Sequence, residues 1–246
     1  MADSVHVQYM KWCAGRPASA IIQMRGTMEE LTFIFEIIGT IAFAISGAIC
    51  GLRVKSDLFG VISLGVITAT GGGMIRDVIL GVTPPSAFTN PVYVTVAAVT
   101  GVIVFIVACD SVKKENEVNP AVYRRVLFYM DAIGLGIFTV LGCDKAISLY
   151  GGDNLFLCVF SGMITGVGGG LLRDMIVDQL PDIFRKYVYA VASIIGGIVS
   201  ALLQRAGYHA LAIYLPAALI VAVRMLAAHY NWSLPKVEQF PEHWKK

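Results

Sequence analysis

Seven long apolar stretches follow one another along the chain, and most of its charged residues lie between them. Each stretch is close to the roughly 20 residues that an α-helix needs to cross the hydrocarbon core of a bilayer. The chain is 57% hydrophobic and only 15% charged, whereas an ordinary soluble domain carries about 25% charge. We therefore predict an all-α membrane protein with seven transmembrane helices. The predicted spans are Leu31–Gly51, Leu58–Leu80, Pro91–Cys109, Val126–Cys143, Leu155–Val177, Tyr187–Leu203 and Ala210–Ala228.

The basic residues predict which ends of these spans face the cytoplasm. Lysine and arginine gather on the cytoplasmic side of membrane proteins. If the N-terminus lies outside, the inside segments hold 13 of the 19 basic residues and the outside segments hold 6. This distribution favours an N-terminus outside and a cytoplasmic C-terminus.

The sequence repeats itself once. Gly-Gly-Gly-x-x-Arg-Asp occurs at residues 71–77 and again at 168–174, an offset of 97. An acidic residue precedes each copy, Glu36 and Asp131, at an offset of 95. Each half of the chain carries one copy of the motif and contains three predicted spans. Because three is odd, the second half must enter the membrane from the opposite side. We therefore predict an inverted three-plus-three repeat followed by a seventh helix, an arrangement that secondary transporters and some channels share.

These patterns divide the chain into five segments. Residues 1–27 are predicted to be a disordered tail or an extension from a misassigned start. The first repeat covers residues 28–125, and the second covers 126–206. The seventh helix covers residues 207–230, and residues 231–246 form a cytoplasmic tail.

The triple glycines have two interpretations. Glycine destabilises a helix by about 1 kcal/mol per position relative to alanine, so each triplet can break its helix and expose carbonyl groups to a cation. Alternatively, the glycines let two helices pack closely. We favour the functional interpretation, because the triplets stand at matched positions. Nearby hydroxyl side chains are further pore candidates, although such groups often bond their own helix backbone. The candidate pore or ion-binding residues are Gly71, Gly72, Gly73, Gly168, Gly169, Gly170, Thr68, Thr165 and Ser46.

Charged residues follow each triplet within one helical turn. Holding them near the membrane requires nearby opposite charge, and cross-pairing between the repeats, Arg76 with Asp174 and Arg173 with Asp77, is one hypothesis. A structural ion pair that locks the two halves is the alternative. Glu36 and Asp131 could lie at a cation entrance or partner the arginines, or they could simply favour a helix N-terminus. Arg224, late in the last span, could extend to the membrane surface.

Several classes of function are not indicated. No HExxH, GxSxG or Walker motif occurs, so we do not expect an enzyme. The five cysteines include no CxxC pair, and no metal site or cofactor is predicted. A net charge of +2 without a basic, aromatic-rich stretch gives no sign of nucleic-acid binding.

The residues around the triplets also resemble a known family. The pattern combines Glu36, Ala42-Phe43-Ala44, Ser46-Gly47-Ala48, Asp57, Phe59-Gly60, Thr68-Ala69, Gly71-Gly72-Gly73, Arg76-Asp77, Leu80-Gly81 and Pro84. It is similar to that of bacterial inner-membrane proteins with a duplicated "glycine transporter" domain, the prokaryotic branch of the trimeric intracellular cation (TRIC) channels. The resemblance covers residues 28–228.

The resemblance implies a multi-pass inner-membrane homotrimer with a separate pore in each protomer. It also implies that the second and fifth helices are kinked at the triple glycines, and that K⁺ and Na⁺ are the permeant ions. The charged residues beside the glycines become pore or gating candidates: Arg76, Asp77, Arg173, Asp174, Glu36 and Asp131. The second repeat has Gly166-Val167 where the first has Ala69-Thr70, so the two kinks need not be equivalent.

Three functions remain open on the residues alone. A cation channel predicts conductance without coupling. A secondary transporter of a small amino acid such as glycine fits inverted repeats and broken helices equally well. A structural membrane protein, whose glycines serve packing, is the third possibility.

Overall fold

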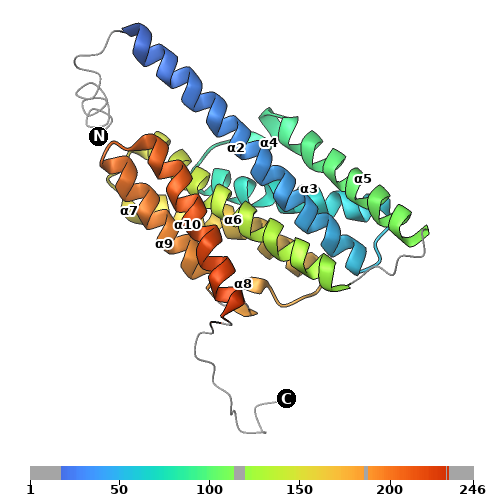
Figure 1. Ribbon diagram of the computed structural model, residues 1–246. Helices are drawn as coiled ribbons and strands as arrows, with labels where there is room; N and C mark the ends of the chain where they lie inside the picture. The colour runs from blue at the N-terminus through green and yellow to red at the C-terminus, as the bar shows by residue number, and fades with distance from the viewer. Residues whose placement is uncertain (1–17, 114–119, 186–187, 231, 233–246) are drawn as a thin grey trace.

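Helices form all the regular structure in the residues that the computed structural model describes, 18–113, 120–185, 188–230 and 232 (Figure 1). Two of them, α4 (Ser86–Thr89) and α8 (Asp182–Arg185), are short. The long helices are α2 (Ala18–Arg53), α3 (Leu58–Ile79), α5 (Val92–Lys113), α6 (Pro120–Tyr150), α7 (Leu155–Ile176), α9 (Tyr189–Arg205) and α10 (His209–His229).

Six of the long helices contain stretches long and apolar enough to cross a membrane, and these match six of the seven predicted spans. The seventh predicted span, Tyr187–Leu203, corresponds to α9, which is apolar but has only 17 residues. A helix of this length rises by about 26 Å, which is slightly less than the hydrocarbon thickness of about 30 Å. α9 follows Val188, which has a left-handed backbone, and ends just before the left-handed Gly207.

α2 begins well before the span predicted at Leu31. It has 36 residues, a length of about 54 Å at 1.5 Å per residue, and its first turns extend beyond the other helices in Figure 1. Residues 18–27, which were assigned to the N-terminal tail, are therefore helical. Residues 1–17 and the C-terminal residues from 233 onward lie outside the described part of the chain.

α3 and α7 begin with the same kind of cap. The carboxylate of Asp57 accepts a hydrogen bond of 2.8 Å from the backbone N–H of Gly60. The side-chain oxygen of Asn154 accepts one of 3.0 Å from the N–H of Leu157. Such caps satisfy N–H groups that the first helical turn leaves without a partner, and they fix where the two glycine-bearing helices start.

Each half of the chain has its own small apolar core. Phe43, Ala44, Ala69 and Ala97 bring α2, α3 and α5 together. In the second half, the core of α6, α7, α9 and α10 consists of Leu135, Val167, Tyr189, Ala192 and Ile220. α3 packs directly against α7, and α2 packs against α6. The pairs α3–α7 and α2–α6 therefore join the two halves, and both triple glycines lie on the first pair.

Candidate functional site

The two triple glycines meet where α3 crosses α7. A Cβ atom added to Gly72 would stand 2.2 Å from the carbonyl oxygen of Thr165, and one added to Gly169 would stand 2.0 Å from that of Thr68. Such distances are far below van der Waals contact, so only glycine fits at either position. Both helices are continuous through their triplets. The predicted breaks at Gly71–Gly73 and Gly168–Gly170 are therefore wrong for this structure, because close packing gives the glycines their role without unwinding.

The predicted hydroxyl residues lie beside this crossing and are all buried. Thr68 donates a hydrogen bond of 2.6 Å to the carbonyl of Leu64, and Thr165 donates one of 2.6 Å to that of Ser161. Both threonines thus bond their own helices, which was the alternative to a pore-lining role. Thr165 also lines a cavity between the two halves, whereas Ser46 accepts a hydrogen bond from Arg173.

This cavity, which we call the Glu36 cavity, has a volume of about 270 Å³. It lies between the middle of α2, the second half of α3, the beginning of α5 and the second half of α6, and it reaches Gly73 and Thr165 at the helix crossing. Its remaining polar lining includes Thr40, Thr70, Arg76, Tyr93, Asp144 and Lys145. The cavity is therefore a polar space inside the bundle that ends at the glycine contact.

Hydrogen bonds hold two carboxylates of the Glu36 cavity in place. The hydroxyl of Tyr93 donates to Glu36. One oxygen of Asp77 accepts from the guanidinium of Arg76 at 2.9 Å, and the other accepts from the backbone N–H of Ser86 at 2.8 Å. Arg76 is thus neutralised by its neighbour, which leaves the carboxylate of Glu36 as an acidic group facing the cavity.

Three matched residues of the second half, Asp131, Arg173 and Asp174, form a closed group with Arg224 of α10 and Ser46 of α2. We call these five residues the Asp131 cluster. One oxygen of Asp131 lies 3.0 Å from Nη1 of Arg173, and the other lies 3.2 Å from Nη2 of Arg224. Nε of Arg173 donates to Asp174 at 2.8 Å. All five residues are buried. A buried charge is tolerated when it is paired, and two arginines here balance two aspartates.

The two ends of the bundle consequently differ. About 20 Å of helix separates Asp131 from Asp144 along α6 at 1.5 Å per residue, so the Asp131 cluster and the Glu36 cavity lie on opposite sides of the helix crossing. The hollow beside Gly170, Asp174 and Tyr189 is too narrow to hold a water molecule. A Cβ added to Gly170 would lie 3.1 Å from the hydroxyl of Tyr189, whereas one added to Gly73 would meet nothing closer than 3.6 Å.

The proposed cross-pairing between the repeats is wrong. Arg76 bonds Asp77, and Arg173 bonds Asp174, because a flexible guanidinium can fold back to the carboxylate of the next residue. The interpretation of Glu36 and Asp131 as helix N-terminal carboxylates is also wrong, since α2 and α6 begin several turns earlier. Asp131 instead partners arginines, which was one of the alternatives.

Sequence reasoning missed several residues of the two sites. Arg224 was expected at the membrane surface, but it is buried and bonds Asp131. An arginine late in an apolar span could have indicated this, since intramembrane charges usually pair inside the bundle. Tyr93, Asp144 and Lys145 also line the Glu36 cavity. A signal for Tyr93 is present in the repeat, because Val92-Tyr93 recurs as Val188-Tyr189.

The chain matches the glycine transporter family twice, over residues 33–108 and 128–205. The two matches agree with the internal repeat. The inner membrane protein YadS of Escherichia coli K12, of the UPF0126 group, is 34% identical over 211 residues, which is 83% of this chain and 95% of the relative. The chain therefore belongs to the glycine transporter family.

Solved structures of TRIC channels share the fold. One, from work on conductance through TRIC cation channels, is 34% identical, with a TM-score of 0.72 over 85% of this chain and 98% of the other. A TRIC orthologue from Rhodobacter sphaeroides is 28% identical, with a TM-score of 0.73 over 82% of this chain and 99% of the other. The resemblance to prokaryotic TRIC channels is thereby confirmed, and these relatives support a membrane cation channel.

Proposed function

We propose that the chain is a cation channel of TRIC type in which each protomer of a homotrimer carries its own pathway for K⁺ and Na⁺. The observation that carries the proposal is the Glu36 cavity, a polar space inside the bundle that reaches the crossing of the two triple glycines. The similarity to solved TRIC cation channels supports it.

The charges of the cavity favour a cation. Three carboxylates line it, those of Glu36, Asp77 and Asp144, against two basic side chains, Arg76 and Lys145. Carboxylates that line a pore attract cations, and Arg76 is paired with Asp77. A K⁺ ion would enter beside Glu36 and Tyr93 and reach Gly73, where Thr70 and Thr165 supply oxygen atoms.

The Asp131 cluster closes the pathway at the other end. Arg173 and Arg224 fill the space that corresponds to the Glu36 cavity, and their buried ion pairs exclude water and ions. The structure therefore represents a closed state, and opening requires the guanidinium of Arg173 to move away from the helix crossing.

The arrangement in the membrane follows from the repeat. The matched Glu36 and Asp131 lie toward opposite ends of the bundle, which supports an inverted three-plus-three repeat plus α10. With the N-terminus outside, the Glu36 cavity opens to the outside and the Asp131 cluster lies toward the cytoplasm, in an inner membrane like that of the E. coli relative. Exposed apolar side chains such as Phe59 and Phe156, each 77% exposed, are available for contacts between protomers.

A planar-bilayer recording of the purified trimer in a K⁺ gradient tests this function. We expect cation-selective currents, and we expect Glu36→Gln to lower the permeability ratio of K⁺ over Cl⁻. Glu30→Gln, an exposed position on the same helix, is the matched control and should leave the ratio unchanged.

Radiolabelled glycine uptake into liposomes tests the competing carrier. Absence of current together with saturable glycine uptake would overturn the channel proposal and favour a secondary transporter. Currents without saturable glycine uptake would exclude the carrier.

A further inference from the structure

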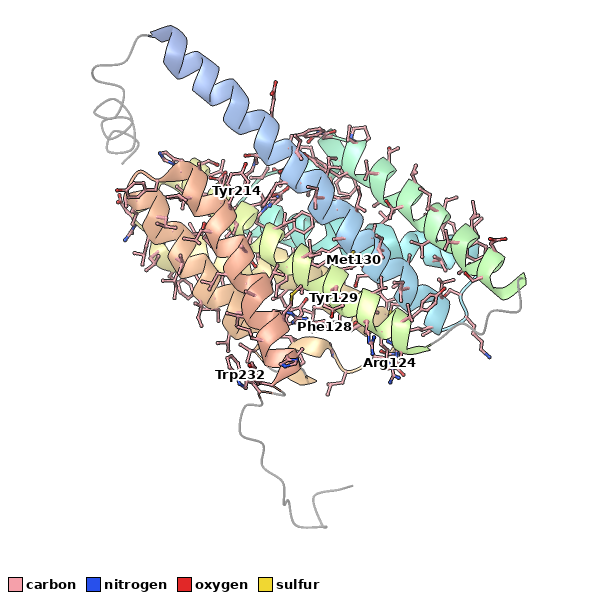
Figure 2. All side chains as sticks on the ribbon, viewed as in Figure 1. Arg124, Phe128, Tyr129, Met130, Tyr214 and Trp232 are labelled. Carbon is pink, nitrogen blue, oxygen red and sulfur yellow. The ribbon has the colours of Figure 1, made fainter. Side chains whose placement is uncertain are left out.

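His209 is the first residue of α10, and its side chain is exposed at the surface of the bundle. α10 packs against α9 and α6. In Figure 2, Tyr214 lies near the beginning of α10 and Trp232 just beyond its end, and Arg124, near the beginning of α6, lies toward the same end as Trp232. The helices α6 and α10 therefore run antiparallel, and His209 lies toward the end of the bundle where α6 finishes.

The register between these two helices places His209 opposite Asp144. Val140 of α6 belongs to the same buried cluster as Ile213 of α10. Residues four apart lie on the same face of a helix, so one further step of four along each helix leads from Val140 to Asp144 and from Ile213 to His209. In agreement with this register, the side chains of His209 and Asp144 interact electrostatically.

Asp144 connects His209 to the proposed pathway. Its carboxylate lines the Glu36 cavity and interacts electrostatically with Glu36. Histidine is the side chain whose charge ordinarily changes between about pH 5 and 8. Because the ring of His209 is exposed, protons in the solution reach it directly and change the charge that stands beside the cavity.

Other charged groups surround His209 on the neighbouring elements. The described ones are Asp144 and Lys145 of α6, Arg205 of α9, Asp153 of the α6–α7 connection, and Glu30 and Glu36 of α2. Lysine and arginine ordinarily stay charged in the range where histidine titrates. Protonation of a carboxylate would weaken the attraction for cations, as protonation of His209 would, so substitutions of His209 itself are needed to isolate its share.

We propose that His209 is a sensor of external pH that controls the entry of cations into the Glu36 cavity. Neutral His209 leaves the negative charge of Asp144 free to attract K⁺. Protonated His209 offsets that charge, so K⁺ concentrates less strongly in the cavity. The inference rests on the proposed channel function and on its orientation, in which the Glu36 cavity opens to the outside.

Planar-bilayer recordings of the purified full-length protein test the proposal, with the pH varied only in the chamber that the Glu36 cavity faces. At low K⁺ concentration, we expect acidification to lower the wild-type K⁺ current by roughly twofold to fivefold, the range that an exposed ion pair provides. His209→Gln is neutral at every pH and should keep the larger current in acid. His209→Lys stays charged and should show the smaller current already at alkaline pH.

The effect of charge can be told from an effect on structure. Salt screens the interaction of exposed charges, so the acid response should shrink at high ionic strength. It should also appear in the K⁺ concentration that gives half-maximal current, with the maximal current unchanged. His229→Gln, which removes the exposed histidine at the other end of α10, is the matched control and should respond to acid as the wild type does.

The outcomes separate this inference from the channel function. His209→Asn is a second neutral variant and should match His209→Gln. An acid response of both neutral variants equal to that of the wild type would overturn the proposal, as would a His209→Lys current equal to the wild-type current at alkaline pH. If the wild type carries no K⁺ current at any pH, the channel function is wrong, and the inference falls with it.

Discussion

At the scale of single residues, matched positions of the two repeats have different surroundings. Glu36 accepts from the hydroxyl of Tyr93 at the edge of a cavity, whereas Asp131 binds two buried arginines. The difference arises from Arg224 on α10, a helix that lies outside the repeat. The two halves of a duplicated sequence therefore form different sites: a polar cavity at Glu36 and a closed cluster of ion pairs at Asp131.

The Asp131 cluster predicts a large effect of a small change. Asp131→Asn removes the carboxylate that neutralises Arg173 and Arg224, and breaking a buried ion pair from one side costs about 3–5 kcal/mol. We expect the thermal unfolding midpoint in detergent to fall clearly. Asp153→Asn, an exposed loop position, is the control, and equal midpoints for the two variants would contradict the account of the cluster.

At the scale of helices, the contact between α3 and α7 organises the molecule. The sequence predicted the positions of six spans closely, because long apolar runs with few charges are a strong signal. It also identified the triple glycines as special. The prediction that they unwind was wrong, because the choice between unwinding and packing depends on the helix that each triplet meets. Gly72 opposes the Thr165 carbonyl, and Gly169 opposes that of Thr68.

Adjacent glycines of one triplet should respond in opposite directions to alanine. Gly72→Ala places a Cβ 2.2 Å from a backbone oxygen, and such overpacking costs about 1–3 kcal/mol. Gly73→Ala meets its nearest atom at 3.6 Å, and replacing a helical glycine by alanine contributes up to about 1 kcal/mol of stability. Thermal unfolding of the two variants checks this, and a destabilised Gly73→Ala with an unchanged Gly72→Ala would refute the packing role.

At the scale of the whole molecule, the structure is open at one end of the bundle and closed at the other. The Glu36 cavity extends to the glycine crossing, and the Asp131 cluster lies beyond it. Neither site could be predicted completely from the sequence. Glu36, Arg173 and Asp131 were found through the repeat, but Arg224 lies on a helix outside the repeat, and Tyr93 was not predicted.

The closed end predicts a gating phenotype. Arg224→Gln removes one of the two ion pairs of Asp131 and leaves the pair with Arg173 in place, so the closed state should lose stability relative to the open state. We expect a higher open probability in single-channel recordings. Arg53→Gln, an exposed position, should behave as the wild type. An open probability of Arg224→Gln equal to that of the wild type would show that this cluster does not close the pathway.

The central claim is that cations pass through the Glu36 cavity, and current through Thr70→Cys tests it most directly. Thr70 lines this cavity and is 6% exposed, and cysteine is close to threonine in size. We predict that a positively charged thiol reagent, added from the side of the cavity, blocks the K⁺ current of Thr70→Cys and leaves that of the wild type, with its native cysteines, intact. A current that persists after complete labelling of Cys at this position would contradict the pathway.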